Sequence, residues 1–515
     1  MKADVTIIGG GLAGLTLARQ LTMQQPDLDV RVVERRAFPV AERTHKVGES
    51  LVELAAHYLG DVLGLREHLL TEHVPKLGLR FFFRSQRPTP IHQRLEYGVF
   101  EPPDLGADQR FAGLPVPGYQ VDRGRLENHL AALVGDRLLQ RTVEGVELGA
   151  GGRHRVCLEG GEAIDTRWLI DASGRRRILA RQLGLGHTFD HAPQALWARV
   201  ACSLRVEDWT DGPAFRSRML RPGLRHLSTN HLVGPGYWVW LIPLPGGATS
   251  VGVMADPALA PIAPRASMAS MLAFLETREP ELAEALRQAP IEDVRTLRSV
   301  AYGARQIFSR DRWAMTGEAA LHLDPLYSPG ADFIAMGNTL ITQMIAADTA
   351  GESLSGRARL SELLFQQLLD GYLEQYRGAY ALMGAPRAMA HKVIWDSTLY
   401  FATHALLFRN GALGDPATLL ALRPELERTR RVHTRAQAAL RKWASREPGA
   451  VSGFLPHECV EPLVRLNFRL KDPVAGAALT DLLRDNLARA ERYLEETLLA
   501  GADGRPYPDA LRGSA

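Results

Sequence analysis

The segment between residues 5 and 34 constrains the fold more strongly than any other part of the chain. A β-branched run, V-T-I-I at 5–8, ends at the glycine turn G-G-G-L-A-G at 9–14 and passes directly into an apolar helical stretch. A second apolar run then closes with Glu34, twenty residues after the last of those glycines. Strand, glycine turn, helix and strand in this order indicate a βαβ unit, whose two strands are parallel. We therefore expect an α/β fold.

The spacing of the glycines also predicts a ligand. In the pattern G-x-G-x-x-G, Gly9 permits the tight turn, Gly11 lets the backbone approach a pyrophosphate, and Gly14 lets the helix pack on the strand. The amino end of the helix then faces the phosphates, where N–H groups and the helix dipole favour anions. Glu34 can accept hydrogen bonds from ribose hydroxyls, and its charge disfavours NADP. We predict a dinucleotide site; a glycine-rich turn without a ligand is the alternative.

Length and composition exclude several other classes of protein. At 515 residues, with 46% hydrophobic and 23% charged residues, the chain is typical of two or three globular domains. Its 61 basic and 58 acidic residues leave a net charge of +3, which gives no reason to expect nucleic acid as a partner. The three cysteines are far apart, so neither disulfides nor a metal site is expected. Because neither a signal sequence nor an apolar run of about 18 residues is present, we expect a cytoplasmic protein without a membrane span.

Two further strand-end motifs favour FAD over NAD as the dinucleotide. Residues 168–174 read W-L-I-D-A-S-G, an apolar strand that ends in an acid and a glycine. Residues 312–318 read R-W-A-M-T-G-E, and Asp324 and Pro325 follow shortly after. Three such returns of the chain to one nucleotide suit the extended FAD molecule. A second G-x-G-x-x-G after a strand is not visible, so we expect the electrons to come from a flavin reductase or from transiently bound NAD(P)H.

With these motifs the chain resembles the superfamily of FAD-dependent aromatic monooxygenases and flavin-dependent halogenases. The resemblance implies a Rossmann-type FAD-binding domain, an inserted β-rich substrate domain and a C-terminal helical region. The family usually has Asp where Glu318 stands. Arg123 resembles the family's arginine that contacts the flavin nucleotide, with a solvated helix cap as the alternative. The predicted cofactor-binding residues are Gly9, Gly11, Gly14, Glu34, Arg35, Lys46, Glu49, Arg123, Asp171, Gly174, Gly317, Glu318, Asp324, Pro325 and Gly330.

Three segments make the resemblance specific to halogenases of the tryptophan-halogenase type. Residues 45–50, H-K-V-G-E-S, resemble the segment that lines the flavin after the second strand. Lys76 lies 27 residues after the glutamate of that segment, near the family's distance for its catalytic lysine. Residues 238–243, W-V-W-L-I-P, match the halogenase signature W-x-W-x-I-P. The alternatives are an exposed lysine at the start of an edge strand, and Trp238 and Trp240 packed as core on one face of a strand.

The match weakens in the loop H-L-D-P-L-Y-S-P-G at 322–330. Its first proline, its serine and its last glycine fit the family pattern, but His322 replaces a phenylalanine. By the resemblance, the backbone N–H at position 329 would help bind the halide, and Pro329 has none. Losing one donor costs a desolvated anion about 1–3 kcal/mol. Tyr327 stands where tryptophan halogenases carry a catalytic glutamate, so free tryptophan is not the expected substrate.

The resemblance implies an FAD-dependent oxidoreductase that forms a flavin C4a-hydroperoxide and acts on a small electron-rich aromatic, free or tethered to a carrier protein, as in secondary metabolism. Because of Pro329 and His322, we expect oxygenation (hydroxylation), with His322 as a proton donor or as a histidine satisfied within its loop. Halogenation is the alternative, with Lys76 steering hypohalous acid by a hydrogen bond or as a haloamine. A non-catalytic FAD-binding docking subunit and a flavin-dependent reductase of isoprenoid double bonds are further alternatives. The predicted catalytic residues are Lys76, His322, Trp238 and Trp240.

The motifs also divide the chain. We expect residues 1–185 and 290–350 to form the FAD-binding domain, 186–289 a substrate-binding β-sheet domain, and 351–515 a helical cap. Between residues 423 and 447 the chain carries eight basic and three acidic residues. This segment could attract an acidic carrier protein, or it could be an ordinary solvated helix face.

Overall fold

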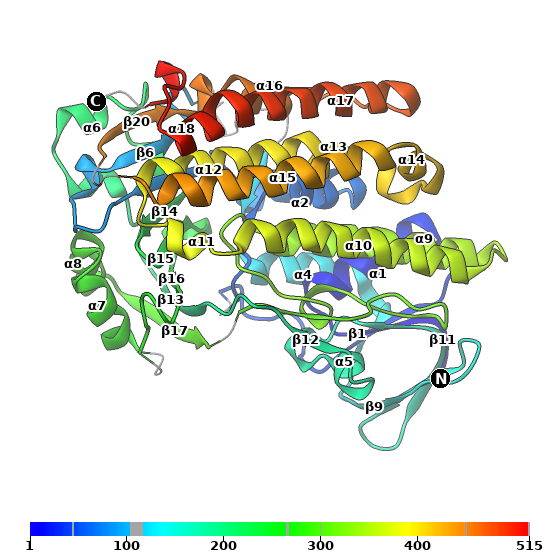
Figure 1. Cartoon of the computed structure of the whole chain (residues 1–515). Coiled ribbons are helices and arrows are strands. Elements are labelled where there is room, and N and C mark those ends of the chain that lie inside the picture. Colours follow the sequence, from blue (N-terminus) through cyan, green and yellow to red (C-terminus); the bar gives the residue numbers. More distant parts are fainter. Residues whose placement is uncertain are drawn as a thin grey trace.

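The computed structural model describes residues 1–43, 46–102, 117–263, 267–298, 300–447, 449 and 451–512. These residues form two large β-sheets and a C-terminal region of long helices (Figure 1). His45, at the start of the H-K-V-G-E-S segment, lies outside the described residues. No helix within these ranges is both long and apolar enough to cross a membrane.

The first sheet contains the predicted βαβ unit. Its seven strands have the order β8, β2, β1, β11, β10, β9, with β19 paired to β11. Helix α1 (Leu12–Gln24) connects β1 to β2. Strands β8, β2, β1, β11 and β19 run parallel, so their carboxyl ends meet at one edge of the sheet. The strand bounds are β1 Lys2–Ile8, β2 Val30–Glu34, β8 Leu138–Gln140, β9 Val143–Glu147, β10 His154–Leu158, β11 Ala163–Asp171 and β19 Trp313–Met315.

The second sheet has eight strands in the order β17, β13, β16, β15, β14, β5, β6, β20. It differs from the predicted segment 186–289, because β5 and β6 come from the amino-terminal part of the chain and β20 comes from the helical region. These strands pair beyond β14 and cover its backbone edge, which would otherwise be open. The bounds are β5 Leu79–Phe83, β6 Leu95–Gly98, β13 Gln194–Val200, β14 Thr229–Gly234, β15 Tyr237–Pro243, β16 Thr249–Ala255, β17 Ile291–Leu297 and β20 Gly453–Pro456.

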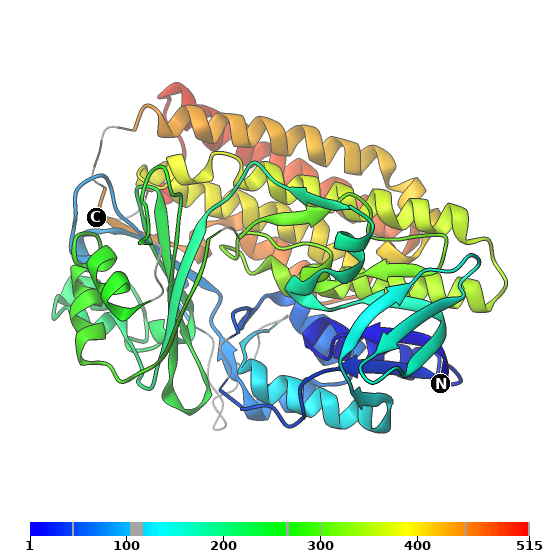
Figure 2. The ribbon, with the colours of Figure 1, turned by 90° about the horizontal axis from the view of Figure 1, so that it is seen from below.

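Side chains alternate between two cores along β15, as the period of two in a strand requires. Tyr237, Val239 and Leu241 belong to a core shared with helices α7 (Met268–Glu276) and α8 (Pro280–Gln288). Trp238 and Trp240 belong to the other core, which extends to the first sheet. Figure 2 shows α7 and α8 on the outer side of the second sheet and the first sheet on its other side.

The C-terminal region packs its long helices side by side above both sheets (Figure 1). Helix α9 leads into this region from the 324–330 loop, and the four-residue helix α11 follows α10. The bounds are α9 Pro329–Thr349, α10 Leu354–Tyr376, α11 Ala379–Leu382, α12 Pro386–Leu399, α15 Arg423–Ala444 and α17 Gly476–Tyr493.

The basic segment at 423–447 is largely balanced in the folded protein. Five of its eight cations form ion pairs with carboxylates, three of which come from residues 491–503. Arg428, for example, binds Glu491 with its Nε 2.8 Å from the carboxylate. Counting charges along the sequence missed this balance, because the compensating acids lie about 60 residues further on. Most of this positive charge is therefore already paired within the chain.

Candidate active site

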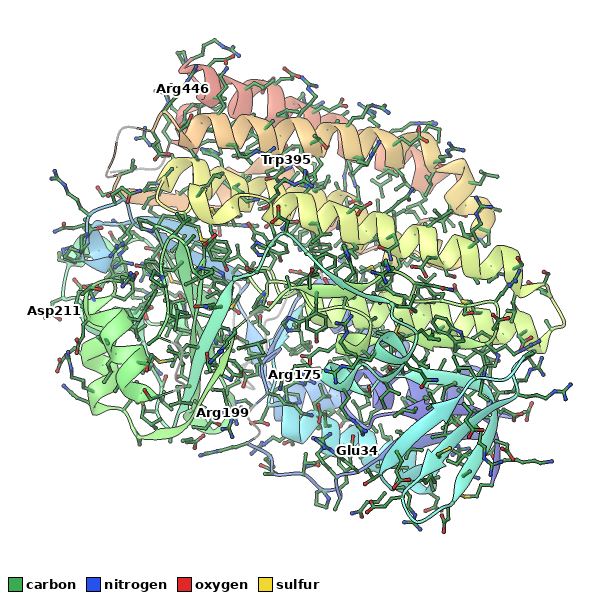
Figure 3. The ribbon with its side chains drawn as sticks, turned by 60° about the horizontal axis from the view of Figure 1, so that its bottom comes forward. Glu34, Arg175, Arg199, Asp211, Trp395 and Arg446 are labelled. Atoms are coloured by element: carbon green, nitrogen blue, oxygen red, sulfur yellow. The ribbon has the colours of Figure 1, made fainter. Side chains whose placement is uncertain are left out.

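A cavity of about 710 Å³ brings together the edge of the first sheet, one face of the second sheet and the amino end of α9. All three predicted FAD motifs contribute to its wall, and so do both tryptophans of the W-x-W-x-I-P segment. Figure 3 shows Glu34 and Arg175 on the side of the first sheet and Arg199 on β13 of the second sheet. Residues from distant parts of the sequence thus surround one space.

The first glycine turn has the geometry of a pyrophosphate site. Gly9 has φ +114°, and a Cβ there would lie 2.3 Å from the carbonyl oxygen of Ala172. A Cβ on Gly14 would lie 1.9 Å from the oxygen of Gly9, so this residue lets α1 pack closely, as predicted. At Gly11, by contrast, no atom of the described residues lies within 4 Å of a built Cβ. Gly11 lines the cavity and is the N-cap residue of α1, which leaves room for a phosphate against the helix N-terminus.

Glu34 ends β2 at the cavity wall. Its carboxylate accepts hydrogen bonds from the backbone N–H of Gly10 at 2.7 Å and of Arg36 at 2.9 Å. Burial alone would raise the pKa of Glu34, but hydrogen bonds and the charge of Arg36 outweigh it and hold the pKa below its usual value. The neighbouring Arg35 is exposed and lines the same part of the cavity. A charged carboxylate is therefore available to ribose hydroxyls.

Lys46 and Arg123 line the cavity and share one buried carboxylate. Arg123 is the first residue of α4 (Arg123–Val134); it donates to Glu127 at 2.9 Å and to the carbonyl of Val47 at 3.0 Å. Lys46 also binds Glu127, and burial lowers the pKa of Lys46 more than that carboxylate raises it. The Arg123 side chain is only 12% exposed, so the helix-cap alternative does not describe it. Glu127 neutralises only one of the two positive charges of Lys46 and Arg123, so a net positive charge remains that can bind a diphosphate.

Glu49 lines the cavity and binds an arginine of the second sheet. Its carboxylate accepts a hydrogen bond from Arg199 of β13 at 2.8 Å, and both side chains are almost fully buried. Arg199 also lies 3.4 Å from the carboxylate of Asp122, the N-cap of α4. This arginine therefore fixes the second sheet against the cofactor side of the cavity.

Two predicted cofactor contacts need correction, because the described lining residues do not include Asp171 and Asp324. Asp171 accepts hydrogen bonds from the backbone N–H groups of Ser173 at 2.9 Å and Leu179 at 2.8 Å. Asp324 accepts one from the N–H of Leu326 at 3.0 Å. Both carboxylates are fully buried. Asp171 binds its own loop, whereas Asp324 binds its own loop and also the hydroxyl of Tyr380. They shape the turns that line the cavity and do not face it.

The third motif lines the cavity with Gly317, Glu318, Pro325 and Gly330. Gly317 has φ +60°, and a Cβ there would lie 2.7 Å from the Cβ of Ala13 in α1. Gly174 of the second motif also has a positive φ, +61°, and lines the cavity. The glycines of the second and third motifs thus bring two loops close to the first glycine turn.

Pro329 occupies the first position of α9, where a missing N–H removes none of the helix's own hydrogen bonds. Ser328 precedes it with a left-handed φ of +57°. Gly330 and Ala331 follow, and both line the cavity. Their N–H groups belong to the first turn of a helix and have no partner within it. The amino end of a 21-residue helix therefore still points its positive end toward the cavity.

The paired indoles are both core and cavity wall. Trp238 and Trp240 are 1% and 5% exposed, and their ring centroids lie 5.6 Å apart at 48°. Both line the cavity. Gly252 of β16 lies opposite Trp240, where a Cβ would come within 2.1 Å of the ring. The two rings therefore pack in the core and line the cavity at the same time, so the core interpretation and the functional one are both correct.

Lys76 is buried and does not start an exposed edge. It ends β4 (Val74–Lys76), is 3% exposed, and its Nζ lies 2.8 Å from the Oγ of Ser50, which lines the cavity. Burial lowers the pKa of Lys76 to about 8, although the nearby carboxyl groups of Glu53 and Asp332 act in the opposite direction. Lys76 is not among the described residues that line the cavity; the side chain of Ser50 lies between its amine and the cavity.

His322 lines the cavity and is satisfied within its own loop at the same time. Its Nδ1 donates to the carbonyl of Val300, and its ring stacks on Tyr302 with centroids 5.9 Å apart. Its Nε2 lies 3.7 Å from the carboxylate of Glu318. This nitrogen is the one that remains for a ligand.

Sequence reasoning missed His231, which lines the cavity beside the indoles. Its Nδ1 donates to the carbonyl of Arg80 at 3.1 Å, and its ring stacks on Phe81 at 4.3 Å. Burial lowers the pKa of His231 to about 3, so the ring is neutral and Nε2 is an acceptor. The two-residue hairpin loop P-G at 235–236 could have revealed this position, because it sets the register that places His231 opposite Trp240.

Fold and cavity together define an FAD-dependent oxidoreductase, and comparisons with known proteins place the chain more closely. A family model described as "Tryptophan halogenase" matches residues 100–355, and one described as "NAD(P)-binding Rossmann-like domain" matches residues 7–87. The chain therefore belongs to the flavin-dependent halogenase family, as a distant member. The predictions of an enzyme, of FAD as its cofactor and of the fold class are confirmed.

Two sequence relatives support the same assignment, and one solved structure supports the fold. The chain is 26% identical to the flavin-dependent halogenase chlA of Dictyostelium discoideum, over 78% of this chain and 69% of the relative. It is 28% identical to a 1H-pyrrole-2-carbonyl-[peptidyl-carrier protein] chlorinase of Pseudomonas fluorescens, over 64% and 72%. The crystal structure of halogenase PltM with phloroglucinol and FAD superposes with a TM-score of 0.64 at 15% identity, covering 98% of this chain and all of the other. The named relatives are halogenases, which favours our alternative over hydroxylation.

Proposed function

We propose that the protein halogenates a small electron-rich aromatic substrate and that Lys76 carries the oxidised halogen to it. The observation that carries this proposal is the buried amine of Lys76, 2.8 Å from Ser50 in the wall of the cavity that the paired indoles also line. Hypohalous acid hydrogen-bonded to a solvent-exposed lysine would diffuse into bulk water. The named halogenase relatives support the same chemistry.

The cofactor and the chain have separate tasks. When bound, reduced FAD with dioxygen supplies the oxidising equivalents. The protonated amine of Lys76 can hold hypohalous acid by a hydrogen bond. The neutral amine can attack the halogen, so that an N–X bond forms as the O–X bond breaks, and the amine proton leaves with the hydroxide as water. Burial favours the second route, because a pKa of about 8 leaves about a tenth of the amine neutral at pH 7.

The amino end of α9 supports a halide site of reduced strength. Pro329 removes one backbone donor, but the N–H groups of Gly330 and Ala331 remain at the cavity wall. An anion there would also meet the positive end of the helix dipole. We therefore expect a halide requirement with a high KM. Hydroxylation is the second candidate, and Pro329 is the observation that favours it.

The substrate and the electron source follow from the same reasoning. The basic segment 423–447 suggested an acidic carrier protein as a partner, but most cations of this segment are already paired within the protein. We therefore propose that the aromatic substrate diffuses freely and is not tethered to a carrier protein. The chain carries one G-x-G-x-x-G after a strand, which supports delivery of reduced FAD by a separate reductase. Reactions with NADPH alone and with NADPH plus a flavin reductase distinguish the two electron sources.

The deciding experiment measures product mass. Purified protein, FAD, a flavin reductase, NADPH and resorcinol are incubated with sodium bromide, with sodium chloride, or with no halide. We expect product with the bromine or chlorine isotope pattern from the wild-type protein, and a loss of at least about a hundredfold in Lys76→Met. The exposed Lys471→Met is the matched control. A product that gains one oxygen at the same rate with and without halide would establish hydroxylation instead.

A further inference from the structure

A chain of hydrogen bonds connects the Trp238 indole to the 324–330 loop through Tyr380 of α11. The Nε1–H of Trp238 donates to the Oη of Tyr380 at 3.1 Å, and this hydroxyl donates to Oδ2 of Asp324 at 2.6 Å. Oδ1 of Asp324 accepts the N–H of Leu326 at 3.0 Å. An indole N–H can only donate and a carboxylate can only accept, so the direction of every bond is determined.

All three side chains of this hydrogen-bond network are buried. Trp238 is 1% exposed, Tyr380 4% and Asp324 0%. Burial raises the pKa of Tyr380 well above its usual value, so the hydroxyl keeps the proton that it donates. The same carboxylate oxygen of Asp324 lies 3.1 Å from Nε2 of His191. A buried network in which every polar group has a partner is rigid, and removing one member leaves the others unsatisfied.

The two ends of this hydrogen-bond network lie on different walls of the cavity. Trp238 belongs to the second sheet, whereas Pro325 belongs to the loop before α9 and Gly330 to the first turn of α9. The strand backbone directs the Trp238 side chain to the correct face but does not determine the tilt of its ring. The hydrogen bond from Nε1 to Tyr380 constrains that tilt, together with the packing of the ring against His231 and Trp240, and the same hydroxyl binds Asp324.

We propose that Tyr380 is a positioning residue that sets the Trp238 indole and the 324–330 loop relative to each other, so that oxidised halogen reaches the substrate instead of escaping. This inference rests on the proposed function. The C-terminal helical region, which the sequence suggested only as a cap, thereby helps to build the active site.

Tyr380→Phe tests the proposal, because it keeps the ring and removes only the hydroxyl. Tyr493→Phe is the matched control: Tyr493 of α17 is also 4% exposed, and its hydroxyl bonds His391 at 2.7 Å, apart from the 324–330 loop. In cofactor-free protein, we expect amide hydrogen exchange across 322–330 to accelerate at least about fivefold in Tyr380→Phe and to stay unchanged in the control. Equal exchange in wild type and Tyr380→Phe would overturn the proposal.

A double-mutant cycle tests whether Tyr380 acts through the indole. The fraction of oxidised flavin that appears as halogenated product should fall about tenfold in Tyr380→Phe, with the remainder trapped as free hypohalous acid by taurine. In a Trp238→Phe background, which lacks the indole N–H, the same substitution should change this fraction less than about twofold. Strictly additive effects would refute the coupling. If the wild type only oxygenates its substrate, the proposed function is wrong. The amide hydrogen exchange measurement still tests the role of Tyr380 in that case, because it does not depend on the reaction.

Discussion

Replacing Lys76 with methionine should stabilise the fold and abolish halogenation in one step. The unfolded chain holds the lysine proton up to a pH of about 10.5, whereas burial lowers the pKa in the folded protein to about 8. Between these values the unfolded state binds more protons, so stability rises with pH, and below pH 8 the full penalty of the buried ammonium is present. The difference corresponds to about 3 kcal/mol.

Methionine fills a similar volume without a charge, so most of that penalty should disappear. Glu53 and Asp332 lose a cationic neighbour, but burial already raises the pKa of both carboxyl groups, which limits the cost. We expect a higher Tm than wild type at pH 7 and a difference that narrows toward pH 10. Thermal denaturation of the cofactor-free protein at both pH values measures this.

The halogenation activity of Lys76→Met should fall, although its stability should rise. At pH 7.5 a pKa of about 8 leaves about a quarter of the amine neutral, against about a thousandth at the ordinary 10.5. Halogenation by wild type should therefore increase with pH up to about 8 and level off, and Lys76→Met should lack this rise. A variant that is no more stable than wild type and that retains halogenation would refute both the burial argument and the role of the amine.

Three further substitutions test the cavity. His231→Phe keeps the stack on its neighbouring ring but removes an acceptor, so KM for a phenol should rise about tenfold while that for its O-methyl ether stays constant in steady-state assays. Gly252→Ala places a methyl group against Trp240 and should destabilise the protein by about 1–3 kcal/mol in thermal denaturation. Gly11→Ala should keep the Tm of cofactor-free protein and weaken FAD at least about tenfold in titrations, whereas Gly14→Ala should lower the Tm itself.

Each of these has a clear contrary result. Gly371→Ala in α10, where a built Cβ has no described atom within 4 Å, is the control for Gly252→Ala and should not destabilise. An equal loss of affinity for phenol and ether would show that His231 is not the acceptor. Unchanged FAD affinity in Gly11→Ala would mean that the pyrophosphate does not pass over the first glycine turn.

How far the sequence could predict the site differed from residue to residue. The glycine turn and its βαβ unit were predictable, because a positive φ or a missing Cβ is a local requirement visible within a few residues. The period of two placed Trp238 and Trp240 on one face for the same reason. The acids Asp171 and Asp324 looked equally suited to the cofactor in sequence, yet both point away from the cavity, Asp171 to its own loop and Asp324 to its loop and Tyr380. Motif spacing contains no information about the direction of a side chain.

What the sequence determined by itself was local: a dinucleotide turn, three loops suited to FAD, and two indoles on one strand face. Only the tertiary structure decided that Lys76 is buried behind Ser50, that His231 lies beside Trp240, and that a tyrosine from the helical region holds the site. The physical reason is that dihedral and periodicity rules act over a few residues. Burial, pKa and hydrogen-bond partners depend instead on segments that meet only after folding, such as Trp238 and Tyr380, which are 142 residues apart.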